Sequence, residues 1–172
     1  MRRWKAAAGS AVFFVVAPAV VAGLIPWLLT HWQVRLEWPM PVRIAGLVLV
    51  VVGAVVLVQA FVRFVIEGLG TPAPIAPTQR LVVGGLYRHV RNPMYLAVLA
   101  VIVGQAIWFG DPVLLGYAAV VWGTVAAFVL GYEEPVLSER FGAEYAAYRK
   151  AVRAWIPRVH PWTPNGGHQS GR

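Results

Sequence analysis

Residues 93–131 read PMYLAVLAVIVGQAIWFGDPVLLGYAAVVWGTVAAFVLG, and Asp111 is the one charged residue among them. The step Gly110-Asp111-Pro112 divides this stretch into two apolar runs, 93–109 and 112–131. Asp-Pro favours a turn followed by a helix start, so we expect an antiparallel helical hairpin. Each run approaches the roughly 20 apolar residues that a helix needs to cross a bilayer core. The stretch therefore predicts two membrane spans joined by a tight turn.

Two apolar segments before the hairpin have the length of membrane spans. Residues 11–29 carry no charge, and residues 42–66 have Arg43 and Arg63 near their ends, where long side chains can reach polar headgroups. Three basic residues before the first segment leave a signal peptide as the alternative there. We expect a span, because the apolar run is long for a signal peptide. The predicted fold class is all-α and polytopic, with about four transmembrane helices.

Composition supports a membrane environment and argues against several classes of function. Only 13% of the 172 residues are charged, whereas a soluble domain carries about a quarter. The chain has no cysteine for a disulfide or a thiolate metal site, and its four histidines lack the spacing of metal ligands. The net charge of +8 fits cytoplasmic arginines and anionic headgroups better than nucleic acid. We expect a membrane partner, with no metal and no nucleic acid.

The basic residues also orient the predicted spans. They cluster before the first span, between the second and third, and after the fourth, whereas the connection 30–41 balances Arg35 with Glu37. Cytoplasmic loops are enriched in Lys and Arg. This distribution therefore predicts a multi-pass protein of the cell membrane with both termini in the cytoplasm.

The connection between the second and third spans is the first candidate for a site. Residues 71–77 are proline-rich and predict an irregular linker. Residues 79–95 follow and read QRLVVGGLYRHVRNPMY, in which Asn92-Pro93 predicts a helix N-cap and the first helical residue. A helix N-terminus beside Arg91 attracts an anionic group. Ordinary capping, with arginines that only set the topology, explains the same pattern.

An acidic pair, Glu133-Glu134, follows the fourth span and is the second candidate. Carboxylates there are costly unless exposed or bound, and the negative end of a helix dipole would oppose them. A solvated helix end is the alternative.

After Pro135, apolar residues recur every three or four positions and predict an amphipathic helix over 135–155. We expect it to lie on the cytoplasmic membrane surface or to cover the loop before the third span. Residues 161–172 are expected to be disordered.

The two candidate segments together resemble a known family. Residues 85–95 resemble the signature G-x-Y-x-x-x-R-H-P-x-Y, and residues 133–153 resemble its C-terminal partner motif. Both are typical of the isoprenylcysteine carboxyl methyltransferase and phospholipid N-methyltransferase group, which are membrane-embedded enzymes that use S-adenosylmethionine. The resemblance implies an N-terminal two-span segment, 1–66, and a methyltransferase-like core, 67–160. That core would contain the cofactor loop, the hairpin 93–131 and the tail helix.

The resemblance also implies roles for individual residues. Arg91, Glu133 and Arg153 are the expected catalytic residues, and the acceptor is expected to be lipidic or prenylcysteine-like and to enter from the bilayer. Asn92 stands where the family has His, and Val129 stands where the prenylcysteine enzymes have a substrate-binding Arg, which argues against a prenylcysteine carboxylate. The residues assigned to S-adenosylmethionine are Gln79, Arg80, Leu81, Val82, Tyr87, Asn92, Pro93, Met94, Tyr95, Glu133 and Glu134.

The chemistry of these residue types fits that cofactor. A glutamate can pair with its ammonium or accept from its ribose diol, and a helix start beside an arginine suits its carboxylate. A tyrosine ring can stack on adenine or face the sulfonium.

Two alternative functions would use the same residues. Membrane sterol reductases carry a related Arg-His-x-x-Tyr turn and use NADPH, whose 2′-phosphate would suit Arg80, Arg88 and Arg91. A non-enzymatic membrane protein would need the arginines only for topology and the tail helix for a partner.

Overall fold

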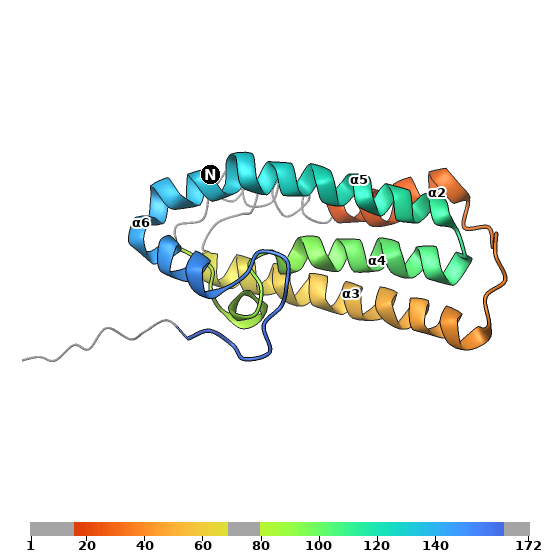
Figure 1. The fold of residues 1–172 in the computed structure, drawn as a ribbon, viewed down its shortest axis with the longest axis horizontal. Coiled ribbons are helices and arrows are strands. Elements are labelled where there is room, and N and C mark those ends of the chain that lie inside the picture. Colours follow the sequence, from red (N-terminus) through yellow and green to blue (C-terminus); the bar gives the residue numbers. More distant parts are fainter. Residues whose placement is uncertain (1–15, 69–79, 164–172) are drawn as a thin grey trace, which may run out of the picture.

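The computed structural model describes residues 16–68 and 80–163. Gln79, the proline-rich run 71–77, residues 11–15 of the first predicted span and 164–172 of the predicted tail lie outside these ranges. The regular elements within the described ranges are helical and form a bundle of long rods lying side by side (Figure 1). In chain order they are η1 (Val20–Leu24), α2 (Ile25–Thr30), α3 (Met40–Gly68), η2 (Gly85–Arg88), α4 (Pro93–Phe109), α5 (Pro112–Phe128), η3 (Val129–Glu133) and α6 (Glu134–Ala151).

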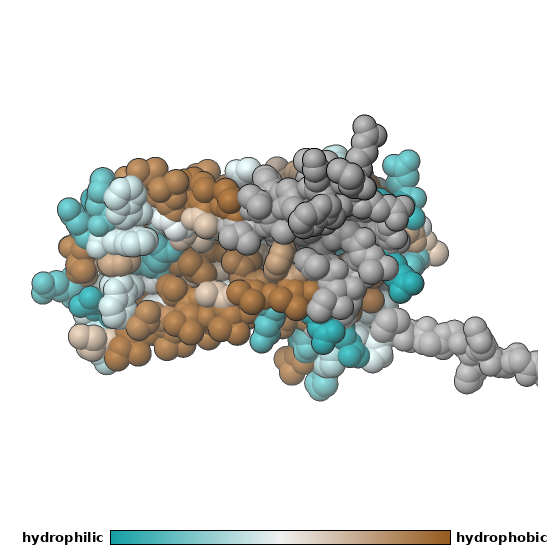
Figure 2. Space-filling view, turned by 180° about the vertical axis from the view of Figure 1, so that it is seen from behind, coloured by the Kyte–Doolittle hydropathy of each residue, from teal (hydrophilic) through white to brown (hydrophobic). Residues whose placement is uncertain are grey.

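The outer surface of the bundle is apolar along its length. Two helical stretches, Met40–Arg63 and Pro112–Ala151, are long and apolar enough to cross a membrane, and Val16–Thr30 and Pro93–Phe109 are shorter apolar helices. Only 17% of an 18-residue apolar segment within each long stretch is buried, whereas the core helix of a soluble protein would be mostly buried. The face seen in Figure 2 is hydrophobic along its middle and hydrophilic toward its two ends. This pattern indicates a helical membrane protein.

The predicted hairpin is present, and its turn is fixed by three adjacent residues. Gly110 adopts a left-handed conformation, with φ of +62°, and a Cβ there would collide with the Leu36 backbone. Asp111 Oδ1 accepts from the Val113 N–H at 2.9 Å and caps α5, while its Oδ2 lies 2.9 Å from Nε of Arg35. Arg35 of the connection 30–41 is thus paired with buried Asp111 at the hairpin tip.

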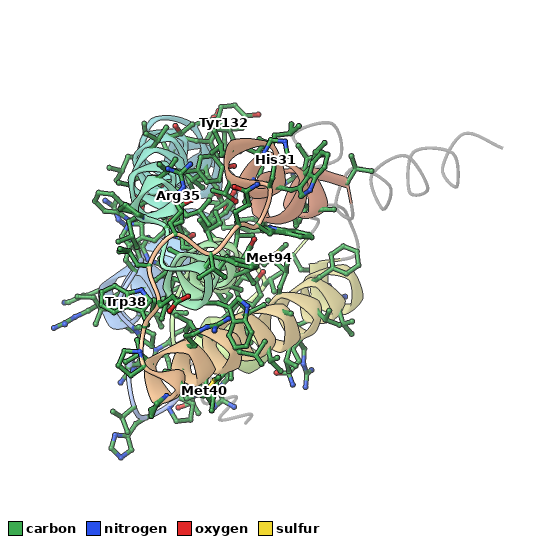
Figure 3. The ribbon with its side chains drawn as sticks, turned by 90° about the vertical axis from the view of Figure 1, so that its right-hand side faces the viewer. His31, Arg35, Trp38, Met40, Met94 and Tyr132 are labelled. Carbon is green, nitrogen blue, oxygen red and sulfur yellow. The ribbon has the colours of Figure 1, made fainter. Side chains whose placement is uncertain are left out.

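The connection that carries Arg35 crosses the same end of the bundle. In Figure 3, which looks at this end, Arg35 and Trp38 lie on the segment that runs from α2 to α3. The Arg35 N–H donates to the Phe109 carbonyl at 2.9 Å, so this connection is also bonded to the last residue of α4. The hairpin tip is therefore held by a backbone bond as well as by the ion pair.

α3 and α4 pack against each other most closely because small residues face each other. A Cβ on Gly104 would lie 2.7 Å from the Gly46 carbonyl oxygen, and one on Gly53 would lie 3.0 Å from that of Ala97. Gly46, Gly53 and the fully buried Ala60 are seven residues apart, so they line one side of α3. Without a hydrophobic driving force inside a bilayer, such close backbone contact favours helix association.

The N-terminal helix is attached to the hairpin by polar contacts. The π turn η1 leaves carbonyl groups available, and the Gln105 amide donates to that of Ala22 at 2.7 Å. The Tyr117 hydroxyl donates to the Val21 carbonyl at 2.8 Å, and the Trp32 indole N–H donates to Gln105 Oε1 at 3.1 Å. Two membrane-depth side chains of α4 and α5 are thereby satisfied, and the helix Val16–Thr30 is positioned against both.

α5 and α6 form one continuous helical rod, which corrects two expectations. The Glu134 N–H bonds to the Val129 carbonyl across the π turn η3, so no helix ends near the acidic pair. The predicted opposition between that pair and a helix C-terminus is therefore wrong. The tail helix also ends at Ala151 rather than 155, because Val152 is extended and fully buried. Inside α6, Gly142 has φ of +49° and kinks the helix.

Candidate functional site

The loop before α4 and the helix α6 meet at one end of the bundle. The apolar side of α6 covers the loop, since buried Tyr145, Tyr148 and Val152 pack with half-buried Leu81 and Val83. The Tyr148 hydroxyl donates to the Tyr87 carbonyl at 2.6 Å. Figure 1 shows α6 curving over the end of the bundle where this loop lies. Of the two expected positions for the tail helix, these contacts correspond to the one over the loop.

A buried ion network joins the same two segments. Nη1 of Arg91 lies 2.8 Å from Glu134 Oε1, and Nη2 of Arg149 lies 3.0 Å from Glu134 Oε2. Arg91 Nη1 also donates to the Tyr145 hydroxyl at 3.0 Å. The Glu134 and Arg91 side chains are only 6% and 12% exposed, so both charges depend on this pairing. The Glu134 carboxylate therefore pairs with two arginines, a role that the sequence did not suggest, and its contact with a cofactor stays a prediction.

The Glu133 carboxylate has a different environment. Its Oε2 accepts from the Tyr95 hydroxyl at 3.2 Å, which links the start of α4 to the end of η3. Glu133 and Tyr95 are both half-buried rather than enclosed. No ion pair is recorded for Glu133 within residues 16–68 and 80–163, so its negative charge can still accept a cation or a hydroxyl group.

The start of α4 carries donors that the protein itself does not use. Asn92 occupies the N-cap position and Pro93 the first turn, as expected, but the Asn92 side chain makes no capping bond. Asn92 is only 7% exposed, and its Nδ2 has no hydrogen-bond partner among residues 16–68 and 80–163. Arg91 Nε is likewise buried without a partner. Because a buried donor without a partner is costly, these two atoms suit a polar or anionic ligand at the helix start.

The loop also touches α3 through a glycine. Gly85 has φ of +54°, and a Cβ there would lie 3.1 Å from Cγ of Arg63. The Arg63 side chain therefore lies against the backbone of the loop. On the inner side of the loop, Val82 and Tyr87 pack with Ala60 of α3, and half-buried Met94 packs against this cluster. These contacts fix the loop between α3 and α6.

Residues 152–163, which we call the strap, hold the loop from outside. The sequence analysis named Arg153 among the expected catalytic residues but did not predict this contact. The Arg91 N–H donates to the Arg153 carbonyl, the Arg158 N–H to His89, and the Trp162 N–H to Arg88, at 2.9–3.0 Å. Arg88 Nε also donates to the Trp162 carbonyl at 2.6 Å. Backbone bonds of this kind have no sequence pattern, so only the aromatic periodicity through Tyr148 pointed toward this region.

The remaining predicted residues fall into two groups. Arg80 and the Arg153 side chain are exposed, so only the Arg153 carbonyl takes part in the contacts described above. Val129, where the prenylcysteine enzymes are expected to carry Arg, is buried in η3 at 2% exposure. The residues that the structure brings together, with side chains buried or half-buried, are Leu81, Val82, Tyr87, Arg91, Asn92, Pro93, Met94, Tyr95, Glu133 and Glu134.

Comparison with known proteins agrees with the residues gathered here. The family model described as "Phospholipid methyltransferase" matches residues 42–144, which run from α3 into α6. The chain is 30% identical over 142 residues to "Protein-S-isoprenylcysteine O-methyltransferase A" of Arabidopsis thaliana, a match that covers 80% of this chain and 66% of that protein. It is 33% identical over 82 residues to "Protein-S-isoprenylcysteine O-methyltransferase B" of the same plant, covering 47% and 41%. The chain thus spans less than two thirds of each relative.

Proposed function

Because this chain belongs to the phospholipid methyltransferase family, we propose that it is an integral membrane methyltransferase that uses S-adenosylmethionine and acts on a lipidic or prenylcysteine-like acceptor. The observation that carries the proposal is the contact between the two motifs. The Tyr95–Glu133 hydrogen bond and the Arg91–Glu134 ion pair join the loop before α4 to the start of α6 at one end of the apolar helices.

The residues in this region fit S-adenosylmethionine. The unpartnered Nδ2 of Asn92 and Nε of Arg91 would bind its carboxylate at the start of α4. The Glu133 carboxylate would accept from its ammonium or its ribose hydroxyls, and Tyr95 orients that carboxylate. Val82, Tyr87 and Met94 would provide an apolar wall. When bound, the cofactor supplies an activated methyl group.

The protein's task in such a reaction is to position the acceptor and exclude water. Proximity and orientation can account for several kcal/mol of a barrier, on the order of 7 or more, without a protein nucleophile. α6 and the strap would close the polar side of the site, and the apolar helices would admit a lipidic acceptor from the bilayer. Buried Val129 offers no charge to an acceptor carboxylate, and the exposed side chain of Arg153 is the proposed substitute.

The same proposal includes the membrane topology. We propose four spans with both termini in the cytoplasm, so that the site faces the inner leaflet. Arg88, Arg91, Arg149 and Arg153 belong to the loop, α6 and the strap, whereas Arg35 at the opposite end is paired with Asp111. This charge asymmetry supports a cytoplasmic site. A reporter enzyme that works only in the cytoplasm should be active when fused after Arg172. Activity of a reporter that works only in the periplasm or lumen would contradict the topology.

Binding of S-adenosylmethionine to purified protein, measured by titration calorimetry in detergent, tests the central claim. Glu133→Gln should weaken binding about tenfold to a hundredfold, since a hydrogen bond to a charged group contributes roughly 1.5–3 kcal/mol. Glu139→Gln, at an exposed position of the same helix, is the matched control and should bind like the natural protein. Equal affinity of both variants would contradict the site, and binding of NADPH in place of S-adenosylmethionine would favour a reductase.

The acceptor can be identified without assuming its class. Membranes that contain the protein should transfer a tritiated methyl group from S-adenosylmethionine to a lipid-extractable product, and the Glu133→Gln variant should not. Label recovered on an amine, a carboxylate or a thiol would distinguish the chemistry. Failure to label any lipid or lipid-modified molecule would contradict a lipidic acceptor.

A further inference from the structure

The strap carries large apolar side chains that the described protein leaves uncovered. Val159 is 88% exposed and Ile156 is 59% exposed. For comparison, Val58 on the outer face of α3, where lipid is expected, is 61% exposed. Single exposed apolar residues are common on protein surfaces, so the neighbouring contacts and charges must show whether these two side chains belong to a contact surface.

The position of the strap places these side chains beside the apolar helices. After α6 the chain first turns back across the end of the bundle that carries the loop (Figure 1). The Trp155 ring packs edge-on against the Trp122 ring, with centroids 6.3 Å apart. Trp122 belongs to the apolar stretch of α5 and is 49% exposed, so the first part of the strap reaches the apolar outer surface of the bundle. Tryptophan favours this boundary between headgroups and hydrocarbon.

The charges around these side chains complement an anionic leaflet. Residues 145–163 contain four basic residues and no acidic residue. Arg158 is used within the protein, since its Nη1 donates to the Ala151 carbonyl at 2.9 Å. Lys150 and Arg153 are exposed. Exposed basic residues next to apolar ones are the combination that binds anionic lipid surfaces.

We infer that the strap is an interfacial anchor. Ile156 and Val159 enter the boundary between headgroups and acyl chains of an anionic leaflet, and Lys150 and Arg153 face the lipid phosphates. Because the strap backbone is bonded to residues 88–91, this contact also connects the lipid surface to the loop that holds the proposed cofactor. Only this last consequence rests on the proposed function.

Because the chain contains no cysteine, a single label can be placed in the otherwise natural protein. Val159→Cys, labelled with an environment-sensitive fluorophore, would be compared in lipid nanodiscs with Ser138→Cys, an exposed position on α6 beside Glu139. The discs would contain phosphatidylcholine and phosphatidylglycerol. We expect nitroxide-bearing lipid to quench the label at 159 and aqueous iodide to quench the label at 138. Equal iodide quenching at both positions would overturn the anchor.

Charge reversal tests the headgroup contact separately. In the Val159→Cys background, Arg153→Glu should lower the ratio of lipid-inserted to water-exposed label by about fivefold for each unit of charge changed. The effect should disappear in discs of phosphatidylcholine alone. An unchanged ratio in anionic discs would overturn the electrostatic part of the inference. Neither measurement requires the cofactor, so a failed anchor and a failed methyltransferase assignment are distinguishable.

Discussion

Replacing Glu134 with alanine should destabilise the protein strongly, because it leaves the Arg91 charge buried without its partner. The two side chains are 6% and 12% exposed, and their charged atoms lie 2.8 Å apart. Breaking a buried pair by removing one partner costs roughly 3–5 kcal/mol. The second partner, Arg149, is 53% exposed, so its contribution should be at most about 1 kcal/mol. We expect the free energy of unfolding to fall by about 4 kcal/mol in total.

Unfolding of the purified protein in mixed micelles, followed by fluorescence, would measure this loss. Glu139→Ala removes an exposed carboxylate from the same helix and should change the free energy of unfolding by at most about 0.5 kcal/mol. The double variant Arg91→Met with Glu134→Leu should recover much of the stability, because apolar replacement of a buried pair is often neutral. The reasoning is refuted if Glu134→Ala resembles Glu139→Ala, or if the double variant loses the sum of the single losses.

Three further changes probe other parts of the bundle. Gly104→Val should lower the free energy of unfolding by about 1–3 kcal/mol in the same assay, because the added side chain forces α3 away from α4. Gly116→Val meets open space and should lower it much less, and equal losses would refute this reasoning. Tyr95→Phe removes one hydrogen bond to Glu133, so it should weaken S-adenosylmethionine binding about fivefold in calorimetry and lower the unfolding free energy by about 1 kcal/mol. Unchanged affinity would separate Tyr95 from the site. Asp111→Asn keeps the helix cap but removes the ion pair, and should lower the unfolding free energy by about 1–2 kcal/mol; a loss above about 4 kcal/mol would show that another contact is involved.

The parts of the fold that could be predicted are those where single residues stop or start a helix. Both bounds of α4 follow from Pro93 and Gly110, because proline begins a helix and a left-handed glycine ends one. The junction of α5 and α6 could not be predicted in this way. The sequence analysis ended the fourth span at 131 and began a separate helix at 135, yet the chain stays helical through the π turn η3 into α6. Only tertiary packing distinguishes the two outcomes.

In the candidate site, too, some contacts could be predicted from the sequence and others could not. Glu133, Tyr95 and Asn92 could be predicted as neighbours because two motifs flanked one hairpin, and a hairpin returns its ends to the same side. The partners of Glu134 and the whole strap could not, since an ion pair across 43 residues and a set of backbone bonds leave no local pattern. Sequence reasoning assigned both carboxylates to a ligand, and it did not predict the two arginines that pair with Glu134.

The five-residue turn η3 has a consequence for how relatives of this chain are aligned. One residue more than an α-helical turn advances the rotational phase of everything that follows by about 100°, given 3.6 residues per turn. The face presented by Glu134 is therefore set by this single insertion, whereas the faces of Tyr145 and Tyr148 also depend on the kink at Gly142. A relative with one residue fewer in this turn would have a different set of side chains directed at the loop, so a gap placed there changes which residues are equivalent.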